Sequence, residues 1–496
     1  MRKIIILAWL MSEIASNTFC QLQNANWILG YDSLFSVQTG RTTINFNSGF
    51  AFSYSYQPMN FGLTTTCMSD SLGNLLFYSN GVYVSNRNDA VMMNGDQLSP
   101  SFYTSSQSSM NLGLELSQAS VAVPSPGHPD EYYLFHCTLD TFDTHGVLFS
   151  RFLYYSIIDM SLDGGLGAVV SKNNILLSDS INQGGFAVCR HGNGRDWWIV
   201  CHRNSKNDFV EFLFTPNGIS SPRILAIGSV RNGFNPTTVF SSDGKMLATI
   251  GADHGVDVFD FDRCSGDLSN HRNVLIPHWQ GFLSGAFSSL GNYLYITNID
   301  SVFQIDMNQT NLSLSLIASW DSTYDPSGPP YAALFHTARL APDNKIYIST
   351  GNTTRYLHVI NFPDQAGAAC DLNQHAIVLP TYNDNSFPYQ INFTLPAAGG
   401  TICDTLGLPD SVLPFQSTDE NSVFVFPNPF ESRLYLKSKK SKGVKIDLIN
   451  SFGEILDIQS HIINESIELQ TESLPHGIYF LSIKNETNTQ VVKLVK

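Results

Sequence analysis

Residues 240–248, Phe-Ser-Ser-Asp-Gly-Lys-Met-Leu-Ala, decide the fold, because they form the clearest copy of a repeated unit of strand, tight turn and strand. A third strand-like stretch follows at residues 256–262. Gly244 supplies the positive φ that a tight hairpin demands, and a side chain such as that of Asp243 bonds back to the main chain in these turns. The stretch therefore predicts three consecutive strands joined by short connections.

The same unit returns along the chain. Close copies occupy residues 287–306 and 340–360, and looser copies occupy residues 69–78, 124–135 and 190–200. The turn positions are 50, 47 and 53 residues apart, at Gly194, Gly244, Gly291 and Asn344. A period near 50 residues with three or four strands per unit is typical of a β-propeller blade, and the near absence of helical periodicity excludes a helical solenoid.

Two further strand-like segments lie at the ends of this region, from Trp27 to Phe46 and from His375 to Phe393. We expect them to pair and close the ring as a seventh blade, because an open array would leave sheet edges exposed. The sequence thus predicts an all-β protein with a propeller of about seven blades at residues 21–396.

The charge distribution predicts a second domain. The whole chain carries a net charge of −15, which argues against a nucleic-acid partner. Residues 420–496 hold nine basic and nine acidic side chains, so the excess of acid lies entirely before them. Short alternating strands at residues 422–496 predict a small Ig-like β-sandwich, with residues 397–421 as a linker.

The first residues resemble a secretory signal peptide. Arg2 and Lys3 precede an apolar run at Ile4–Met11 that is too short to span a bilayer. We expect cleavage after Cys20, which gives a signal peptide at residues 1–20. No other apolar run has the length of a membrane helix.

Cysteine spacing suggests disulfides rather than metal binding. An exported protein can pair its thiols, and Cys189 with Cys201 is the best candidate because the two flank one strand pair. Cys370 with Cys403 is a second candidate. The chain has no Cys-x-x-Cys motif and no zinc-type spacing.

Sequence motifs name no catalytic, cofactor or metal residue. The scattered histidines lack a metal-ligand spacing, and His136 and His358 are expected to pack within strands. Asp257, Asp260 and Asp262 could coordinate calcium, but a solvated strand face explains them more simply. The Pro/Gly-rich connection at residues 324–331 is the preferred ligand loop, with Tyr324, Asp325 and Tyr331 as its candidate residues, although an ordinary long connection explains it equally well.

Two parts of the chain resemble known families. The body is similar to exported propeller-type proteins of the Bacteroidetes through residues 77–81, 154–160, 192–198, 259–263 and 342–347. The tail resembles the type A C-terminal sorting domain of the type IX secretion system. The matching residues are Pro427, Asn428, Pro429, Gly453, Gly477, Tyr479, Lys493 and Lys496. The resemblance implies passage through the periplasm, recognition of the tail by the type IX machinery, and a body that is released or held at the cell surface.

These observations favour a non-enzymatic, secreted or cell-surface module that binds a glycan or a surface protein. A propeller hydrolase of the lactonase-like or glycan-active kind is the alternative. A structural subunit of a surface or motility assembly is a third class. Converging carboxylates in the propeller centre would favour the enzyme.

Overall fold

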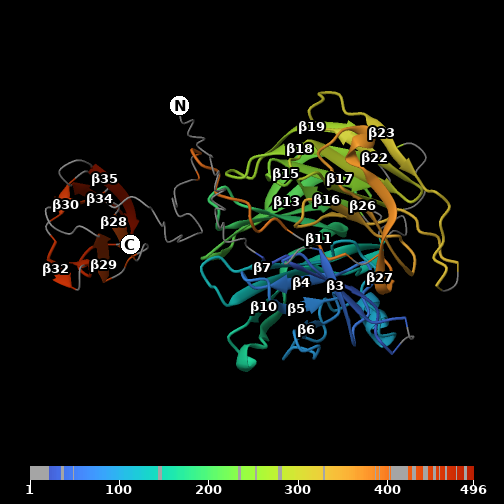
Figure 1. The fold of residues 1–496 in the computed structure, drawn as a ribbon, viewed down its shortest axis with the longest axis horizontal. Coiled ribbons are helices and arrows are strands. Elements are labelled where there is room, and N and C mark those ends of the chain that lie inside the picture. The colour runs from blue at the N-terminus through green and yellow to red at the C-terminus, as the bar shows by residue number, and fades with distance from the viewer. Residues whose placement is uncertain are drawn as a thin grey trace, which may run out of the picture. The chain divides into compact units, whose positions relative to one another are not determined.

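The structure of the protein is a computed structural model that describes residues 22–34, 38–47, 50–142, 148–232, 236–251, 254–276, 282–327, 330–385, 387–389, 391–401, 403, 423–426, 430, 432–438, 445–450, 454–456, 458–463, 466–475, 477–484 and 489–496. The chain divides into two compact units, residues 1–406 and 407–496. The expected signal peptide lies outside the described residues, and the linker bounds stay a prediction. Figure 1 shows both units as assemblies of strands.

The strands in the described part of the first unit form six antiparallel β-sheets. We divide the nine-stranded sheet at its long strand β11 into sheets 3 and 4, which gives seven blade-like sheets. Sheet 1 contains β1 (Asn26–Gly30), β2 (Arg41–Asn45) and β3 (Ala51–Ser55), and sheet 2 contains β4 (Thr66–Ser69), β5 (Leu75–Ser79) and β6 (Val84–Asn86). Sheet 3 contains β7 (Ser120–Pro124), β8 (Glu131–Cys137), β10 (Leu148–Asp159) with β9 (Thr141–Phe142) beside it, and the first part of β11 (Ala168–Arg190). Sheet 4 contains the last part of β11, β12 (Trp197–Arg203), β13 (Lys206–Thr215), β14 (Gly218–Ile219) and β15 (Arg223–Arg231).

The remaining three sheets of this unit each have four strands in chain order. Sheet 5 contains β16 (Thr237–Phe240), β17 (Met246–Gly251), β18 (Gly255–Phe261) and β19 (Leu268–Val274). Sheet 6 contains β20 (Leu283–Phe287), β21 (Tyr293–Asn298), β22 (Ser301–Asp306) and β23 (Leu314–Ser319), and sheet 7 contains β24 (Ala338–Leu340), β25 (Ile346–Ile348), β26 (Thr354–Ile360) and β27 (Leu372–Asn383). The described helices are α1 (Phe102–Ser109) and two 3₁₀ turns, Asp163–Gly165 and Gly367–Cys370.

The predicted turns form with the geometry expected of them. In sheet 5 the Gly244 amide donates to the Ser241 carbonyl over 2.9 Å, and Gly244 has a φ of 69°. Asn344 makes the same bond to Ala341 over 2.9 Å with a φ of 64° in sheet 7. Asparagine tolerates this left-handed conformation, which explains why it replaces glycine there.

Apolar residues between neighbouring sheets close the seven sheets into a ring. Ile28 of sheet 1 packs with Cys67 and Tyr78 of sheet 2, and one larger core joins sheets 2, 3 and 4. Three more cores join sheet 4 to sheet 5, sheet 5 to sheet 6, and sheet 6 to sheet 7. Trp27 and Ile44 of sheet 1 pack against sheet 7, which completes the circuit. The first unit is therefore a β-propeller of seven blades.

The two ends of the ring meet differently from the expectation. β1 and β2 form sheet 1 with β3, whereas β27 is the fourth strand of sheet 7. The two sheets meet where the Tyr382 amide donates to the Gln38 carbonyl over 3.0 Å and the Thr42 and Thr381 hydroxyls lie 2.6 Å apart. The blue β3 and the orange β27 lie close together in Figure 1. The predicted pairing into one sheet is wrong, because β27 is the edge strand of sheet 7, where it pairs with β26, and β1 to β3 form a sheet of their own.

Residues 387–401, described except at 390, run on from sheet 7 and are called the closing segment below. The Tyr389 amide donates to the Thr65 carbonyl over 3.0 Å, just before β4. Farther on, Arg190 of sheet 4 donates to the Phe393 carbonyl over 2.7 Å. The closing segment thus contacts sheet 4 and the residue before sheet 2, which are far apart in the chain, and helps to hold the ring together.

The second unit contains two four-stranded sheets around one apolar core. One sheet has the order β28 (Val423–Phe426), β29 (Arg433–Ser438), β33 (Ser466–Gln470) and β32 (Ser460–Ile463). The other has the order β31 (Ile455–Leu456), β30 (Lys445–Asn450), β34 (Ile478–Lys484) and β35 (Thr489–Val495). The unit is the small Ig-like β-sandwich that the sequence predicts.

The disulfide prediction is wrong. The structure pairs Cys264 with Cys403, whose Cα atoms lie 5.4 Å apart, and Cys189, Cys201 and Cys370 are free and buried. Cys189 packs in the core between sheets 4 and 5, whereas Cys201 packs in the core that joins sheets 2 to 4. The two thiols therefore lie on opposite faces of sheet 4 and cannot meet.

We predict that Cys264→Ser lowers the free energy of unfolding of the first unit by about 2–4 kcal/mol, because the disulfide closes a long loop of the unfolded chain. Denaturant unfolding measures the loss, and Ser265→Ala on the same turn is the matched control. Non-reducing peptide mapping should recover a Cys264–Cys403 pair, and a Cys189–Cys201 peptide would contradict the structure.

Candidate functional site

Tyr31, Glu115, Tyr331 and Asp384 form a group that we call the acidic cluster. The charges of Asp384 and Glu115 and the phenol of Tyr331 all act on the Tyr31 hydroxyl, so the four side chains lie near one another. They come from four separate segments: the end of β1, the connection between α1 and β7, the connection between β23 and β24, and the residue after β27. The ring, not the local sequence, brings them together.

The position of Tyr31 follows from the strand before it. Asn26 at the start of β1 donates to Ser69 over 3.0 Å and to the Gly73 carbonyl over 2.7 Å, beside the repeated turn of sheet 2. Tyr31 follows the opposite end of β1, so the acidic cluster lies at the end of the ring away from the repeated turns. Its hydroxyl lies 2.8 Å from the Thr353 hydroxyl and is hydrogen-bonded to Asp384.

A polar network links the Tyr31 segment to the Glu115 segment. The Asp32 amide donates to Asn60 Oδ1 over 2.8 Å, and Asn60 Nδ2 donates to the Asn111 carbonyl over 2.6 Å. Asn111 Nδ2 in turn donates a hydrogen bond to Asp32 Oδ2 over 2.9 Å. Gly62 leaves room for the Glu115 carboxyl, since a Cβ at residue 62 would lie 2.7 Å from Glu115 Oε1. The acidic cluster is thus held by side-chain amides and by a glycine.

Both carboxyl groups of the acidic cluster hold their protons unusually tightly. Burial and the charge of Asp384 raise the pKa of Glu115 to about 7. Burial raises the pKa of Asp384 to about 6, although the bond from Tyr31 opposes the rise. Glu115 as a whole residue is exposed, whereas protein atoms surround its carboxyl group closely enough to raise the pKa. Near neutral pH the pair can both donate and accept hydrogen bonds.

The predicted ligand loop contributes one residue to this group. Asp325 is buried, and its carboxylate accepts the Ser327 amide over 2.8 Å and the Arg355 amide over 2.7 Å, so it fixes the loop to β26. Tyr331 is 40% exposed and belongs to the acidic cluster, whereas Tyr324 is 49% exposed and packs edge-on against Trp320. The loop as a ligand-binding element stays a prediction.

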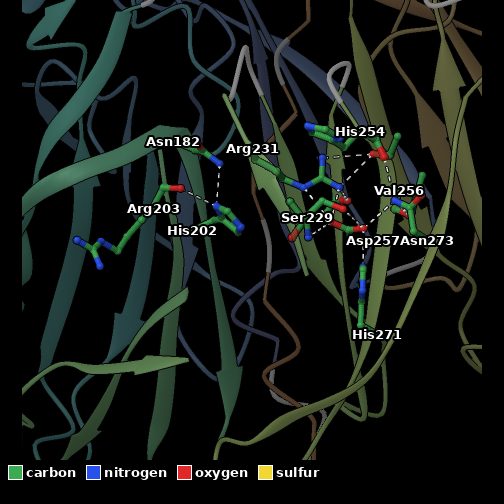
Figure 2. Close-up of polar contacts among 12 residues, drawn as sticks. Asn182, His202, Arg203, Ser229, Arg231, His254, Val256, Asp257, His271 and Asn273 are labelled. Carbon is green, nitrogen blue, oxygen red and sulfur yellow. Dashed lines mark hydrogen bonds and ion pairs between the residues drawn. The ribbon is translucent and has the colours of Figure 1, made fainter. Parts of the chain in front are cut away.

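A second polar group surrounds Asp257, between sheets 4 and 5. Figure 2 shows the contacts converging on its carboxylate. The fully buried Arg231 lies 2.9 Å from Asp257 Oδ2, and His271 Nε2 and Asn273 Nδ2 lie 2.8 and 2.7 Å from Oδ1. Burial alone would raise the pKa of Asp257, but Arg231 and the bonds from His271 and Asn273 outweigh it and lower the pKa. This group joins two blades.

The other two carboxylates proposed for calcium also have local partners. Asp260 pairs with Arg272 over 3.2 Å and accepts from Asn270 over 3.0 Å, and Asp262 accepts the Cys264 amide over 2.8 Å in a turn. Among the residues that the structure describes, no group of three or more His, Cys, Asp or Glu side chains is arranged to hold a metal ion.

The sorting residues that the structure describes stabilise the end of the second unit. Gly477 and Lys496 exchange backbone hydrogen bonds of 3.1 and 3.0 Å, and the buried Tyr479 donates to the Pro475 carbonyl over 2.6 Å. The Lys496 ammonium donates to the carbonyls of Thr471, Glu472 and Leu474 over 2.5, 3.0 and 2.6 Å. Lys493 lies on β35. Pro427, Asn428, Pro429 and Gly453 lie outside the described residues.

Sequence patterns do not single out Tyr31, Glu115 or Asp384. Each stands in a segment without a motif, and no spacing relates one to the others. Among the four residues, the sequence indicated only Tyr331, because it stands in a Pro/Gly-rich connection. The adjacent Trp197 and Trp198, in contrast, are buried in two different inter-sheet cores, and His136 and His358 are buried as expected.

Comparison with known proteins identifies the tail. Residues 424–496 match the family of secretion system C-terminal sorting domains, which marks a type IX sorting signal. No curated protein matches the chain. None of the helices in the described part of the chain is long and apolar enough to cross a membrane.

Solved structures are similar to this chain only at a low level. A proposed 6-phosphogluconolactonase from Bacteroides uniformis is 14% identical, with a TM-score of 0.44 over 72% of this chain and 97% of that one. A protein of unknown function from Desulfotomaculum acetoxidans is 13% identical, with a TM-score of 0.40 over 73% and 99% of the two chains. The β-propeller domain of Cps50 (Swd1) from Myceliophteria thermophila is 11% identical, with a TM-score of 0.36 over 66% and 90%. Similarity this low transfers no activity to the chain.

We predict that Glu115→Gln weakens the pH dependence of stability. The native pKa of Glu115, about 7, lies above its ordinary value of 4.5, so its contribution to stability is present below pH 4.5 and is lost as the pH rises through 7. The variant should therefore unfold at a temperature higher than wild type at pH 8, by on the order of 1–2 °C.

Thermal unfolding between pH 4.5 and 8.5 measures the effect. Asp130→Asn, at an exposed carboxylate outside the acidic cluster, is the control and should follow wild type. A Glu115→Gln curve parallel to wild type over the whole range would show that Glu115 holds no unusual proton.

Proposed function

We propose that this type IX cargo is an exported propeller that binds a hydroxyl-rich ligand, a glycan, at the acidic cluster. The sorting domain indicates secretion or export to the cell surface and interaction with the type IX machinery. The sorting domain does not name a ligand, so the glycan is our proposal. An exported protein encounters its ligand outside the cell, where cell-surface and environmental polysaccharides are the abundant polyhydroxylated molecules.

The observation that carries the proposal is the acidic cluster itself. Glu115 and Asp384 have pKa values of about 7 and about 6, so at neutral pH the pair presents both a donor and acceptors to ligand hydroxyls. The exposed face of Tyr331 offers an apolar surface on which a sugar ring can stack. A few converging polar groups beside an aromatic ring are typical of small-molecule sites.

A hydrolase of glycans is the second candidate, and the same two carboxyl groups favour it. Hydrolysis of a glycosidic bond uses one carboxylic acid to protonate the leaving oxygen and one carboxylate as base or nucleophile. Carboxyl groups whose pKa values are raised toward neutrality are suited to the acid role. Glu115, with the higher pKa, would be the acid and Asp384 the base or nucleophile.

We predict that Asp384→Asn weakens glycan binding by about tenfold, because a hydrogen bond to a carboxylate is worth more than one to an amide. Tyr331→Ala should weaken binding by about two- to tenfold through loss of stacking. A glycan array with the purified protein identifies the ligand, and calorimetry compares the variants. Tyr56→Ala, at an exposed tyrosine that follows β3, is the matched control.

Once the glycan is identified, a binding protein and a hydrolase give different results. Binding without the release of reducing ends supports the binding protein. Release with a bell-shaped pH profile, whose limbs lie near the apparent values of about 6 and about 7, supports the hydrolase. An array without any hit, or equal binding by Asp384→Asn and wild type, would exclude the acidic cluster as a glycan site.

We predict that removal of residues 422–496 stops export past the outer membrane. In a host with a type IX system, the truncated protein should accumulate inside the cell, and immunoblots of cell and medium fractions measure the shift. Lys496→Ala is a milder variant that should reduce export, because the Lys496 ammonium caps three carbonyls of the sorting unit. Normal export of the truncated chain would contradict the assignment.

A further inference from the structure

A pocket of about 700 Å³ lies at the end of the ring that carries the repeated turns. Its walls are the ends of the first strands of sheets 4 to 7 and the turns that follow those of sheets 5 to 7. Leu22 and Asn24 before β1 and residues 389, 391, 392 and 394–396 of the closing segment complete the lining. Pockets that hold small molecules in proteins have volumes of roughly 300–1,000 Å³. The space therefore suits a small organic molecule, and it lies away from the acidic cluster.

The wall of this pocket is cationic in an acidic protein. Its described lining contains four basic side chains, Arg190, Lys245, Arg263 and Arg339, and one carboxylate, that of Asp243. Asp243 is paired with Lys245 over 3.7 Å, and both are partly exposed. The complete chain, in contrast, has a net charge of −15. A local excess of positive charge in a concave site concentrates anions there.

Arg339 is the most unusual of the four basic side chains. It lies on β24, is 7% exposed, and its Nε has no hydrogen-bond partner. One terminal nitrogen donates to the Ala338 carbonyl over 3.0 Å, and the guanidinium carbon lies 5.6 Å from the centre of the Tyr389 ring. Burial lowers the pKa of Arg339 to about 10, so the group remains charged at neutral pH.

Main-chain carbonyls hold the neighbouring guanidinium groups in place. Arg190 donates to Phe393 O over 2.7 Å, and Arg263 donates to Arg190 O over 2.9 Å and to Pro396 O over 2.7 Å. Carbonyl acceptors fix the orientation of a guanidinium group but do not cancel its charge. The closing segment thus preorganises a cationic wall.

A buried charge without a counter-ion destabilises a fold, and an apolar side chain of similar size would be tolerated better. A bound anion would supply both the missing counter-charge and the missing hydrogen-bond acceptor of Arg339. The planar guanidinium group matches a carboxylate or a phosphate, which it can bind with two parallel hydrogen bonds.

We propose that the pocket binds a small organic anion, with its carboxylate or phosphate group seated on Arg339 and with Lys245 at the rim. This site does not depend on the glycan proposal, because it uses different residues at the other end of the ring. It gives the exported propeller a second, chemically distinct ligand class.

The test is anion-dependent stabilisation of the purified full chain. Inorganic phosphate and glucuronate are titrated separately at low ionic strength, with sodium chloride as the ionic-strength control. Calorimetry and thermal unfolding then report binding. We expect at least one of the two anions to bind at millimolar concentration or below, and the tighter binder tells phosphate recognition from carboxylate recognition.

Substitutions separate this site from general charge effects. Arg339→Gln should weaken anion binding by about tenfold or more. Arg339→Met should also lose the binding, yet unfold without anion at a temperature no lower than wild type, because it removes an uncompensated charge. Lys245→Gln, whose side chain is 78% exposed, should fold normally and weaken binding by about threefold. Arg151→Gln, at an exposed residue of β10, is the matched control.

Three results would overturn the proposal: no response to either anion, equal affinity in wild type and Arg339→Gln, or a clear loss of stability in anion-free Arg339→Met, which would make Arg339 a structural residue. If the Arg339 variants do not fold, Lys245→Gln decides. An unchanged affinity in that variant excludes the pocket.

Discussion

Closure of the ring is the constraint on which the rest of the propeller depends. Each sheet buries its two faces against two neighbours, so a gap between sheet 1 and sheet 7 would expose apolar surface on both. Trp27 fills that gap, with its ring centre 5.2 Å from that of Phe387 and 5.9 Å from that of Tyr347. Both partners come from the far end of the unit, so the first blade is completed only when residues 320 and 360 positions later in the chain have folded onto it.

The closing segment that follows has consequences beyond stability. Asp384 stands just before it and joins Tyr31 and Glu115 in the acidic cluster. Residues 389, 391, 392 and 394–396 of the segment line the cationic pocket. One stretch of chain therefore separates two sites of opposite charge at the two ends of the ring. The Cys264–Cys403 disulfide and the bonds from Arg263 fasten the end of this stretch to sheet 5. Export, which the sorting domain indicates, takes the chain out of the reducing cytoplasm into surroundings where such a disulfide can form.

Sequence patterns predicted features that neighbouring residues determine, such as turns. They mispredicted contacts that depend on which face of a sheet a side chain occupies. The turn at Gly244 could be predicted because its geometry is set by four neighbouring residues. Cys189 and Cys201 are near in sequence, but the alternation of side chains along paired strands sends them into different cores. Asp325 was proposed as a ligand residue from its place in a Pro/Gly-rich connection, but its carboxylate accepts the main-chain amide of Arg355, a partner that no spacing could reveal.

The sequence by itself determined the all-β class, the blade period and the sorting tail. Each of these rests on patterns within a few tens of residues: turn chemistry, strand alternation and the order of a short motif set. Only the tertiary structure decided the disulfide, the acidic cluster and the pocket around Arg339. Their residues are distant in sequence, and the burial and charge that give them their properties exist only after seven sheets have packed into a ring.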